Sequence, residues 1–400
     1  MYLYPMPTFR HKFFNHLAQT SDMPMALEIV SAEGNYQIGA DGKKYLDLIS
    51  GIAVSNLGHH HPEIIKDIKK QLDAHLHLMV YGEFIQPAQV KLASALAELL
   101  PDSLSSVFFV NSGSEAVEGA LKLAKRYTGR TEIISCKNAY HGSTHGALSI
   151  IGSEEWKISF RPLLPDIRQI TFNHWDDLAF ISERTACVII EPVQGEAGVR
   201  IANDFYLQAL RRRCTETGTL LIFDEIQSGF GRTGHLFAFE HFDCIPDILL
   251  LGKAMGGGLP LGAFISSPEI MKSLTHDPVL GHISTFGGHP LSCAASLAAL
   301  EVLRKTSHME DAHAKGNLFK ELLVHEEIRE VRGMGLMLAV EMRDFDFVQK
   351  VIHRCIHYGL ITDWFLFCDN SLRIAPPLTI TENEIRNACE VILKSIDESI

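Results

Sequence analysis

Leu220-Leu221-Ile222-Phe223-Asp224 and Ile248-Leu249-Leu250-Leu251-Gly252-Lys253 decide the fold, because each is a short, continuous apolar run that leads to a charged residue. Apolar runs of this length are typical of strands that are buried on both faces of a sheet. Similar runs lie upstream, separated by longer amphipathic segments: Val107–Val110, Ile133–Cys136 and Cys187–Ile190. Strands that alternate with helices predict an α/β fold with a mostly parallel sheet.

One further run, Gly262–Ile265, follows Lys253 after only a short loop. A parallel crossover needs a longer connection, so this strand is expected to be antiparallel or to lie elsewhere. A long Ala-rich helix is expected from Leu291 to about Leu303.

Both ends of the chain differ from this pattern. Near the start, Asp41-Gly42 separates the short runs Tyr36–Ile38 and Lys44–Leu46, which predicts a hairpin. After about residue 305, amphipathic helices dominate, with one strand at Leu336–Val340. A chain of 400 residues exceeds what one hydrophobic core usually serves. We therefore expect a large domain over residues 56–304 and a smaller one over 305–400, which the N-terminal segment 1–55 joins.

The composition describes an ordinary globular chain, with 46% hydrophobic and 21% charged residues. The net charge of −12 argues against nucleic acid or an anionic membrane as partner. Eight scattered cysteines without a C-x-x-C pair favour reduced thiols. Residues Met1–Pro5 lack the features of a signal peptide, and no apolar run is long enough to span a bilayer. We expect a soluble, cytoplasmic protein.

Three charged residues follow strands of the predicted sheet. Glu191, Asp224 and Lys253 each come at or just after the carboxyl end of a run, where ligands bind in open α/β sheets. Singly, each fits a buried ion pair or a solvated strand end. Together on one rim, with glycine-rich sequence after each, they favour a site.

The chemistry of this group fits pyridoxal phosphate. A desolvated lysine within flexible backbone, here Lys253 before Ala254–Pro260, can form a Schiff base. A carboxylate, here Asp224, is what a pyridinium nitrogen requires. The stretch Asn111-Ser112-Gly113-Ser114-Glu115-Ala116 opens a helix after a strand, and the amides of Gly113 and Ser114 there would form a phosphate cradle. Alone, this stretch would be an ordinary serine N-cap.

Two other patterns are weaker. Gly229–Gly234 matches the G-x-G-x-x-G of dinucleotide-binding sites, which would indicate an NAD-dependent oxidoreductase, but no clear helix follows it. We expect a loop there. The triplet His59-His60-His61 suggests metal, yet adjacent histidines cannot all face one ion, and Pro62 indicates a helix start. No metal site is expected.

Six motifs together resemble one known family. They are Asn111–Ala116, Tyr140-His141-Gly142, Glu191–Glu196, Asp224–Gly234, Gly252-Lys253-Ala254 and Ser284–Gly288. In this order they resemble class III (ornithine/acetylornithine type) aminotransferases of PLP fold type I, over nearly the whole chain. The resemblance implies a large domain with a mostly parallel, mixed seven-stranded sheet flanked by helices, plus a smaller α+β domain.

The resemblance also implies roles. Lys253 would form the Schiff base and move the proton, and Asp224 would pair with the ring nitrogen. The remaining cofactor-binding residues would be Gln227 near the ring hydroxyl, Tyr140 and Ile226 on the ring faces, Gly113 and Ser114 at the phosphate, and Ser112, His141 and Glu191 around them. Thr285 would complete the phosphate site from the neighbouring subunit, which implies a homodimer with a shared active site.

The expected reaction is ping-pong transfer of an amino group from a terminal-amine donor, ornithine or N-acetylornithine, to 2-oxoglutarate. In ω-amino acid members of the family, a glutamate covers an arginine that binds the 2-oxo acid; Glu196 and Arg373 match this pair. One departure leaves the donor open. Ser143 stands where the family commonly has an arginine that binds a remote carboxylate. Diamine aminotransferases of the putrescine type lack this arginine too. A diamine or 4-aminobutyrate-type donor is therefore the alternative.

Overall fold

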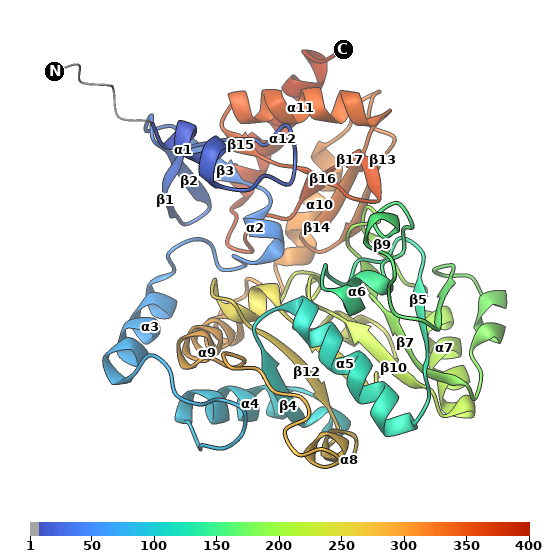
Figure 1. Cartoon of the computed structure of the whole chain (residues 1–400). Helices are drawn as coiled ribbons and strands as arrows, with labels where there is room; N and C mark the ends of the chain where they lie inside the picture. Colours follow the sequence, from blue (N-terminus) through green and yellow to red (C-terminus); the bar gives the residue numbers. More distant parts are fainter. Residues whose placement is uncertain (1–7) are drawn as a thin grey trace.

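The computed structural model describes residues 8–400, so the expectation about Met1–Pro5 lies outside it (Figure 1). A seven-stranded sheet forms its centre, in the order β4-β12-β11-β10-β7-β5-β6. The strands are β4 (Ser106–Val110), β5 (Glu132–Cys136), β6 (Ile167–Ile170), β7 (Thr185–Ile190), β10 (Leu220–Asp224), β11 (Ile248–Leu251) and β12 (Gly262–Ser266). The expected mixed, mostly parallel sheet is confirmed.

β12 is the exception expected from its short connection. It pairs antiparallel with β11 on one side and with β4 on the other, so β4 and β11 run in the same direction. Apolar runs did not identify β6, because this edge strand carries Arg168 and Gln169.

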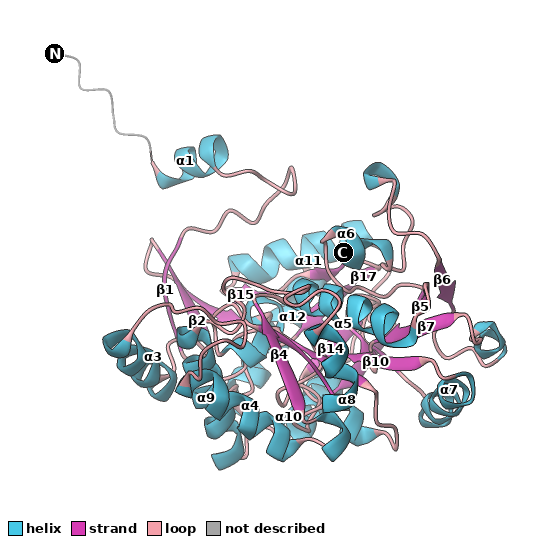
Figure 2. Cartoon of the chain, turned by 60° about the horizontal axis from the view of Figure 1, so that its bottom comes forward, coloured by secondary structure: helices cyan, strands magenta, loops and turns pink. Residues whose placement is uncertain are grey.

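The central strands are buried on both faces, which explains their unbroken apolar sequence. In β10, Leu221 and Phe223 pack into the core cluster that includes Leu207 of α7 (Asp204–Thr217). The alternate residue Ile222 packs into the cluster that includes Val117 of α5 (Gly113–Thr128). Helices therefore cover both sides of the sheet, as Figure 2 shows.

The helices of this part differ in length. Those of four turns or nearly so are α3 (Pro62–Ala74), α4 (Pro87–Leu99), α5 (Gly113–Thr128), α7 (Asp204–Thr217) and α9 (Pro290–Lys305). Two short ones are α6 (His145–Ser149) and α8 (Pro268–Met271). α9 corresponds to the expected Ala-rich helix, and Pro62 begins α3 as expected.

Two smaller sheets lie above the large one in Figure 1. The first contains the expected hairpin and has the order β1 (Ile29–Glu33), β2 (Tyr36–Gly39), β3 (Lys44–Asp47), β15 (Leu360–Ile361). The second has the order β13 (Glu330–Met334), β14 (Met337–Glu341), β17 (Cys368–Ile374), β16 (Trp364–Phe365). Around them lie α1 (Phe9–His16), α2 (Ser50–Ala53), α10 (Ala312–Leu322), α11 (Phe345–His357) and α12 (Glu382–Asp397).

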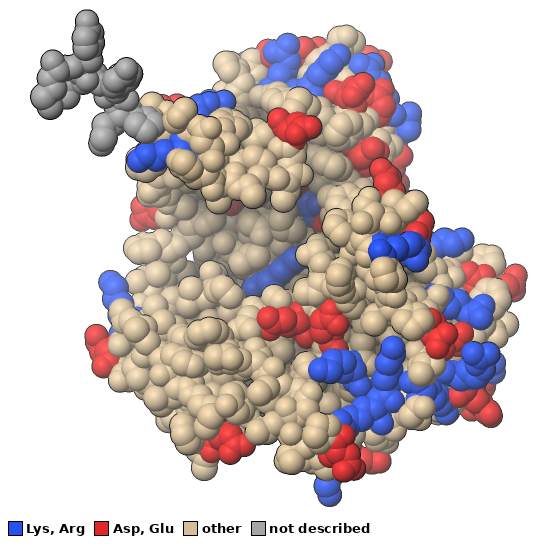
Figure 3. All heavy atoms as spheres, in the orientation of Figure 1, with Lys and Arg blue, Asp and Glu red and all other residues tan. Residues whose placement is uncertain are grey.

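The N- and C-terminal segments are joined by pairing of β3 with β15, and the amide of Ala375 donates to Leu48 O at 2.6 Å. The domain boundaries at residues 55/56 and 304/305 stay a prediction. In Figure 3 the surface is hollowed between the upper and lower parts of the molecule. Within residues 8–400, no helix combines the length and the apolar character needed to cross a membrane.

Candidate active site

The carboxyl ends of five strands meet at one edge of the large sheet, where a cavity of about 190 Å³ lies. Asp224 ends β10, Glu191 follows β7, and Lys253 comes two residues after β11. The parallel register, which pairs Phe223 with both Ile190 and Leu249, brings these three ends together. The cavity is lined by Gly113, Ser114, Tyr140, His141, Gly142, Ser143, Glu191, Glu196, Asp224, Ile226, Gln227 and Lys253. The site residues predicted from the sequence include all of these except Gly142 and Ser143, of which Ser143 was noted only as the place of a missing arginine.

Lys253 is held in an unusual backbone conformation. It begins the short 3-10 helix η5 (Lys253–Gly256) with φ of 47°, a left-handed value that a non-glycine residue rarely adopts. Burial lowers the pKa of its amine below the usual value. The neutral amine, which is the nucleophilic form, is thereby favoured. Strain and desolvation at one lysine indicate a functional position.

Asp224 is fixed by two hydrogen bonds. His141 Nδ1 lies 2.7 Å from Asp224 Oδ2, and the amide of Ile226 donates to Oδ1 at 3.1 Å. The imidazole Nε2 of His141 is buried without a partner. A buried carboxylate positioned in this way can accept a hydrogen bond from a protonated ring nitrogen.

The other end of the cavity lies at the first turn of α5. Gly113 is the first residue of this helix, whose N-terminus carries exposed amides and partial positive charge. A Cβ added at Gly113 would lie 2.8 Å from Ile226 Cδ1, and one at Gly142 would collide with Ser114. The Ser114 hydroxyl lies 2.8 Å from that of Thr144. Glycine at these two positions therefore leaves room for the side chains of Ile226 and Ser114 beside the helix N-terminus.

Glu191 lies on the cavity wall between these ends. Burial raises the pKa of its carboxyl to about 7. The amides of Tyr140 and Gly195 donate to it at 3.0 and 2.9 Å, so Glu191 also holds the loop that carries Tyr140 and His141.

Glu196 and Arg373 form the expected pair. Arg373 on β17 donates to both Glu196 oxygens, at 3.0 and 2.9 Å, and both side chains are buried. Burial raises the pKa of Glu196, but Arg373 outweighs burial and holds it below its usual value. Sequence reasoning missed Asp363, which accepts from Arg373 Nε at 2.8 Å. An apolar neighbour, Phe365, lies under the guanidinium, 4.3 Å from it.

Two expected cofactor-binding residues do not line this cavity. Ser112 is exposed, and its hydroxyl caps α5 by accepting from the amide of Glu115 at 3.2 Å. The N-cap role that the sequence also allowed is therefore present, and a contact of Ser112 with the cofactor stays a prediction. Thr285 is exposed on the loop before α9.

The two weaker patterns have structural roles. Residues Gly229–Gly234 form turns, and no helix follows directly, so the dinucleotide motif is not supported. Its Arg232 is fully buried and donates to Leu336 O at 3.0 Å, to Pro376 O at 2.5 Å and to Asn56. This residue, which ties three distant segments together, was missed because a buried arginine leaves no apolar pattern.

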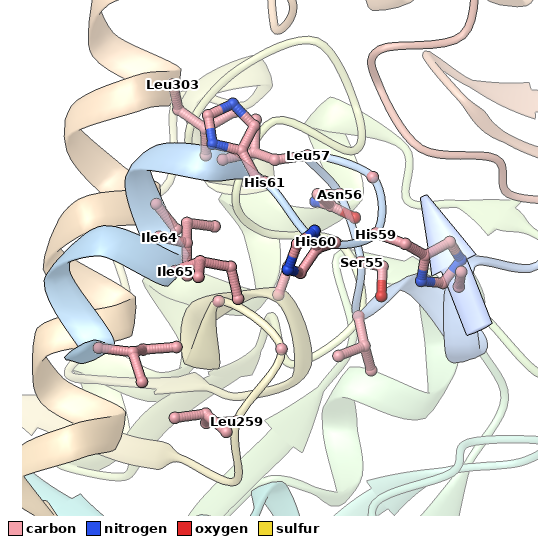
Figure 4. A pocket seen from close by; sticks show the side chains of 18 residues that line it. Ser55, Asn56, Leu57, His59, His60, His61, Ile64, Ile65, Leu259 and Leu303 are labelled. Carbon is pink, nitrogen blue, oxygen red and sulfur yellow. The ribbon is translucent and has the colours of Figure 1, made fainter. Parts of the chain in front are cut away.

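A larger cavity, of about 320 Å³, lies beside α3 and α9 (Figure 4). The rings of His59, His60 and His61 point to different sides of it, as expected for neighbours in a chain. His59 Nε2 instead lies 2.8 Å from Asp47. No lysine, arginine or carboxylate lines this cavity, so the smaller one is the candidate site.

The residues of the smaller cavity fit pyridoxal phosphate. They provide a buried lysine amine, a fixed carboxylate and, at Gly113, a helix N-terminus whose amides can bind a phosphate.

Comparisons with known proteins agree with this geometry. The family model described as "Aminotransferase class-III" matches residues 17–396. The chain is 41% identical over 378 residues to the acetylornithine aminotransferase of Methanopyrus kandleri, covering 93% of this chain and 94% of that protein. It is 42% identical over 322 residues to the LysW-aminoadipate semialdehyde/glutamate semialdehyde transaminase of Sulfolobus acidocaldarius, covering 79% and 82%.

Among solved structures, the ornithine aminotransferase from Toxoplasma gondii matches with a TM-score of 0.90 and 30% identity over 98% of this chain and 96% of that one. A second structure of that enzyme shows partial occupancy of PLP at its active site.

Proposed function

Because the chain belongs to the class-III aminotransferase family, whose members depend on pyridoxal phosphate, we propose that it transfers an amino group from a terminal-amine donor of the ornithine or N-acetylornithine type to 2-oxoglutarate. The observation that carries the proposal is the meeting of Lys253, Asp224 and the α5 N-terminus on one cavity.

Pyridoxal phosphate, when bound, supplies a ring that accepts electrons from the reacting carbon. Lys253 would hold the cofactor covalently, take the proton from the amine-bearing carbon of the donor with its Nζ, and deliver that proton to a carbon of the cofactor. Asp224 keeps the ring nitrogen protonated, and His141 keeps Asp224 in place.

The remaining residues of the cavity position the cofactor. Gly113 and Ser114 would hold the phosphate, and Gln227 would lie near the ring hydroxyl. Tyr140 and Ile226 would cover the ring faces and exclude water, and Glu191 would support the Tyr140 loop. The places of these residues on the cavity wall support the roles that the family resemblance implies.

Glu196 and Arg373 would let the site accept a different substrate in each half-reaction. With the pair closed, Arg373 is neutralised, and an uncharged or basic donor chain can enter. When Glu196 swings away, the guanidinium can bind the second carboxylate of 2-oxoglutarate with two hydrogen bonds.

A diamine of the putrescine type is the second candidate donor, and one observation favours it. Ser143 lines the cavity at an exposed position, and no arginine is present there to bind a remote carboxylate. A 4-aminobutyrate-type donor carries a remote carboxylate, so Ser143 does not favour it in this way.

We also propose a homodimer with a shared active site. Two exposed stretches of the chain, one with His77 and one with Phe286, lie side by side. The ring centroids of these two residues are 4.8 Å apart. Ile85 is 92% and Val279 is 74% exposed, which is costly unless another surface covers them. A second copy that covers this face would bring Thr285 of the partner subunit to the phosphate end.

The test uses the purified holoenzyme and follows cofactor absorbance on addition of ornithine, N-acetylornithine, putrescine and 4-aminobutyrate. A response to ornithine or N-acetylornithine supports the first donor class, and a response to putrescine alone contradicts it. Lys253→Ala should abolish turnover but leave a folded protein that still holds the cofactor. Lys137→Ala, which changes an exposed lysine just after β5, is the control. Unchanged turnover in Lys253→Ala would refute the proposal.

A further inference from the structure

Three imidazoles meet at the junction between the loop after Gly234 and the first turn of α10. They belong to His235, to His241 at the end of the 3-10 helix η4 (Ala238–His241), and to His313. One nitrogen of each lies within 4.8 Å of the others. The ring centroids are 4.3 Å apart for His235–His241, 5.4 Å for His241–His313 and 6.3 Å for His235–His313.

The ring of His241 is oriented by Thr233. Its Nε2 lies 3.1 Å from Thr233 O and 3.3 Å from Thr233 Oγ1. A carbonyl oxygen only accepts, so Nε2 carries the proton and Nδ1 keeps its free lone pair. An outer hydrogen bond to a backbone carbonyl is the usual way in which a metal-binding histidine is oriented.

The backbone also makes room for the cluster. Gly234 has φ of 101°, and a Cβ there would overlap the ring of His313. Glycine at this position therefore allows His313 of α10 to approach the loop. Glu225 supports the same loop, since its carboxylate accepts from the amide of Phe239 at 2.7 Å, inside η4.

One acidic group lies beside the cluster. The Glu240 carboxylate is 3.6 Å from His235 Nδ1. A carboxylate oxygen can serve as a further ligand of an ion that imidazoles hold.

We propose that His235, His241 and His313 bind one divalent first-row transition-metal ion, with Zn²⁺ as the reference ion. Zn–N distances of about 2.0–2.1 Å in a tetrahedron place ligating nitrogens about 3.3 Å apart. The cluster reaches this separation by side-chain rotation of His235 and His313, which are exposed. Water or Glu240 completes the coordination.

The ion would be structural. It would link α10 to the loop that carries buried Arg232, and so join the C-terminal segment to the large sheet. Imidazole ligands favour Zn²⁺, Cu²⁺ and Ni²⁺ over Mg²⁺ and Ca²⁺, which prefer oxygen.

The test is isothermal titration of untagged, chelator-treated holoenzyme with Zn²⁺, and with Mg²⁺ as the ion control. The wild type should bind one Zn²⁺ per chain at this site. His235→Gln, His241→Gln and His313→Gln should each weaken binding by at least about 10-fold, and His353→Gln, at an exposed position on α11, should not. Binding of equal affinity by all three variants would overturn the proposal.

Thermal unfolding gives a second readout. Zn²⁺ at 100 times its Kd should shift the folding equilibrium by about 100-fold and raise the Tm, and the variants should lose this rise. In EDTA, the exposed-site variants His235→Gln and His313→Gln should melt like the wild type, which shows that they fold. A wild type with no Zn²⁺-dependent rise in Tm contradicts the inference, whatever the transaminase substrate is.

Discussion

Replacing Glu196 with glutamine removes the charge that covers Arg373 and keeps the shape of the side chain. In the wild type, Arg373 makes two charge-assisted hydrogen bonds to Glu196, one to Asp363 and one to Trp364 O. The Asp363 and Trp364 bonds remain in the variant, so the guanidinium keeps its place. An incoming carboxylate then competes with a neutral amide for Arg373.

The magnitude follows from the bonds that change. A hydrogen bond to a charged group contributes about 1.5–3 kcal/mol net. We take about 2 kcal/mol as the interaction free energy that Arg373 loses with position 196. The kcat/KM for glutamate as donor should then rise by about 30-fold relative to the kcat/KM for the terminal-amine donor. The ratio is informative because damage to the cofactor site would lower both values together.

The assay measures both half-reactions by stopped-flow absorbance of the cofactor. Glu341→Gln is the control, since Glu341 pairs with Arg332 on the C-terminal sheet and does not line the cavity. That variant should leave the ratio unchanged. If Glu196→Gln also leaves the ratio within about 3-fold of the wild type, Arg373 is not covered by Glu196 during the reaction, and the selection mechanism is wrong.

Three other variants test separate parts of the molecule. Ser143→Arg should raise kcat/KM for donors with a remote carboxylate by about 10-fold relative to putrescine, measured by steady-state kinetics. The pKa of Glu191 is raised to about 7, so the folded protein keeps a proton that the unfolded chain releases near 4.5. Stability should therefore fall by up to about 3 kcal/mol between these pH values in urea unfolding of the cofactor-free protein, and Glu191→Gln should remove this dependence. Arg232→Met leaves buried carbonyls unpaired and should cost about 3 kcal/mol in urea unfolding, whereas Arg212→Met at an exposed position should cost less than about 0.5 kcal/mol.

The sheet and the cofactor end of the site could be predicted from the sequence for one physical reason. Strands that are buried on both faces have continuous apolar sequences. The residue after each such run therefore lies at the carboxyl-end edge of the sheet. Asp224, Glu191 and Lys253 were found in this way. The helix that begins at Gly113 was readable from its glycine and serines.

Other contacts left no local signal. Asp363 reaches Arg373 only because β16 and β17 pair, which no periodicity reveals. The edge strand β6 was not predicted, because its polar residues can face solvent and interrupt the apolar run. The three histidines of the proposed metal cluster come from two segments that only the tertiary fold brings together, so sequence reasoning weighed the adjacent triplet His59–His61 instead.

The placement of the cavity on strand ends has a consequence for how this protein can diverge. Lys253 and Asp224 are set by register, and a shift of one residue in β10 or β11 would turn their neighbours to the opposite face. Ser143 and Glu196 lie in loops, where substitution moves no strand. Donor preference can therefore change by single substitutions in the loops while the cofactor-binding frame stays intact, so relatives with the same frame are free to act on different amines.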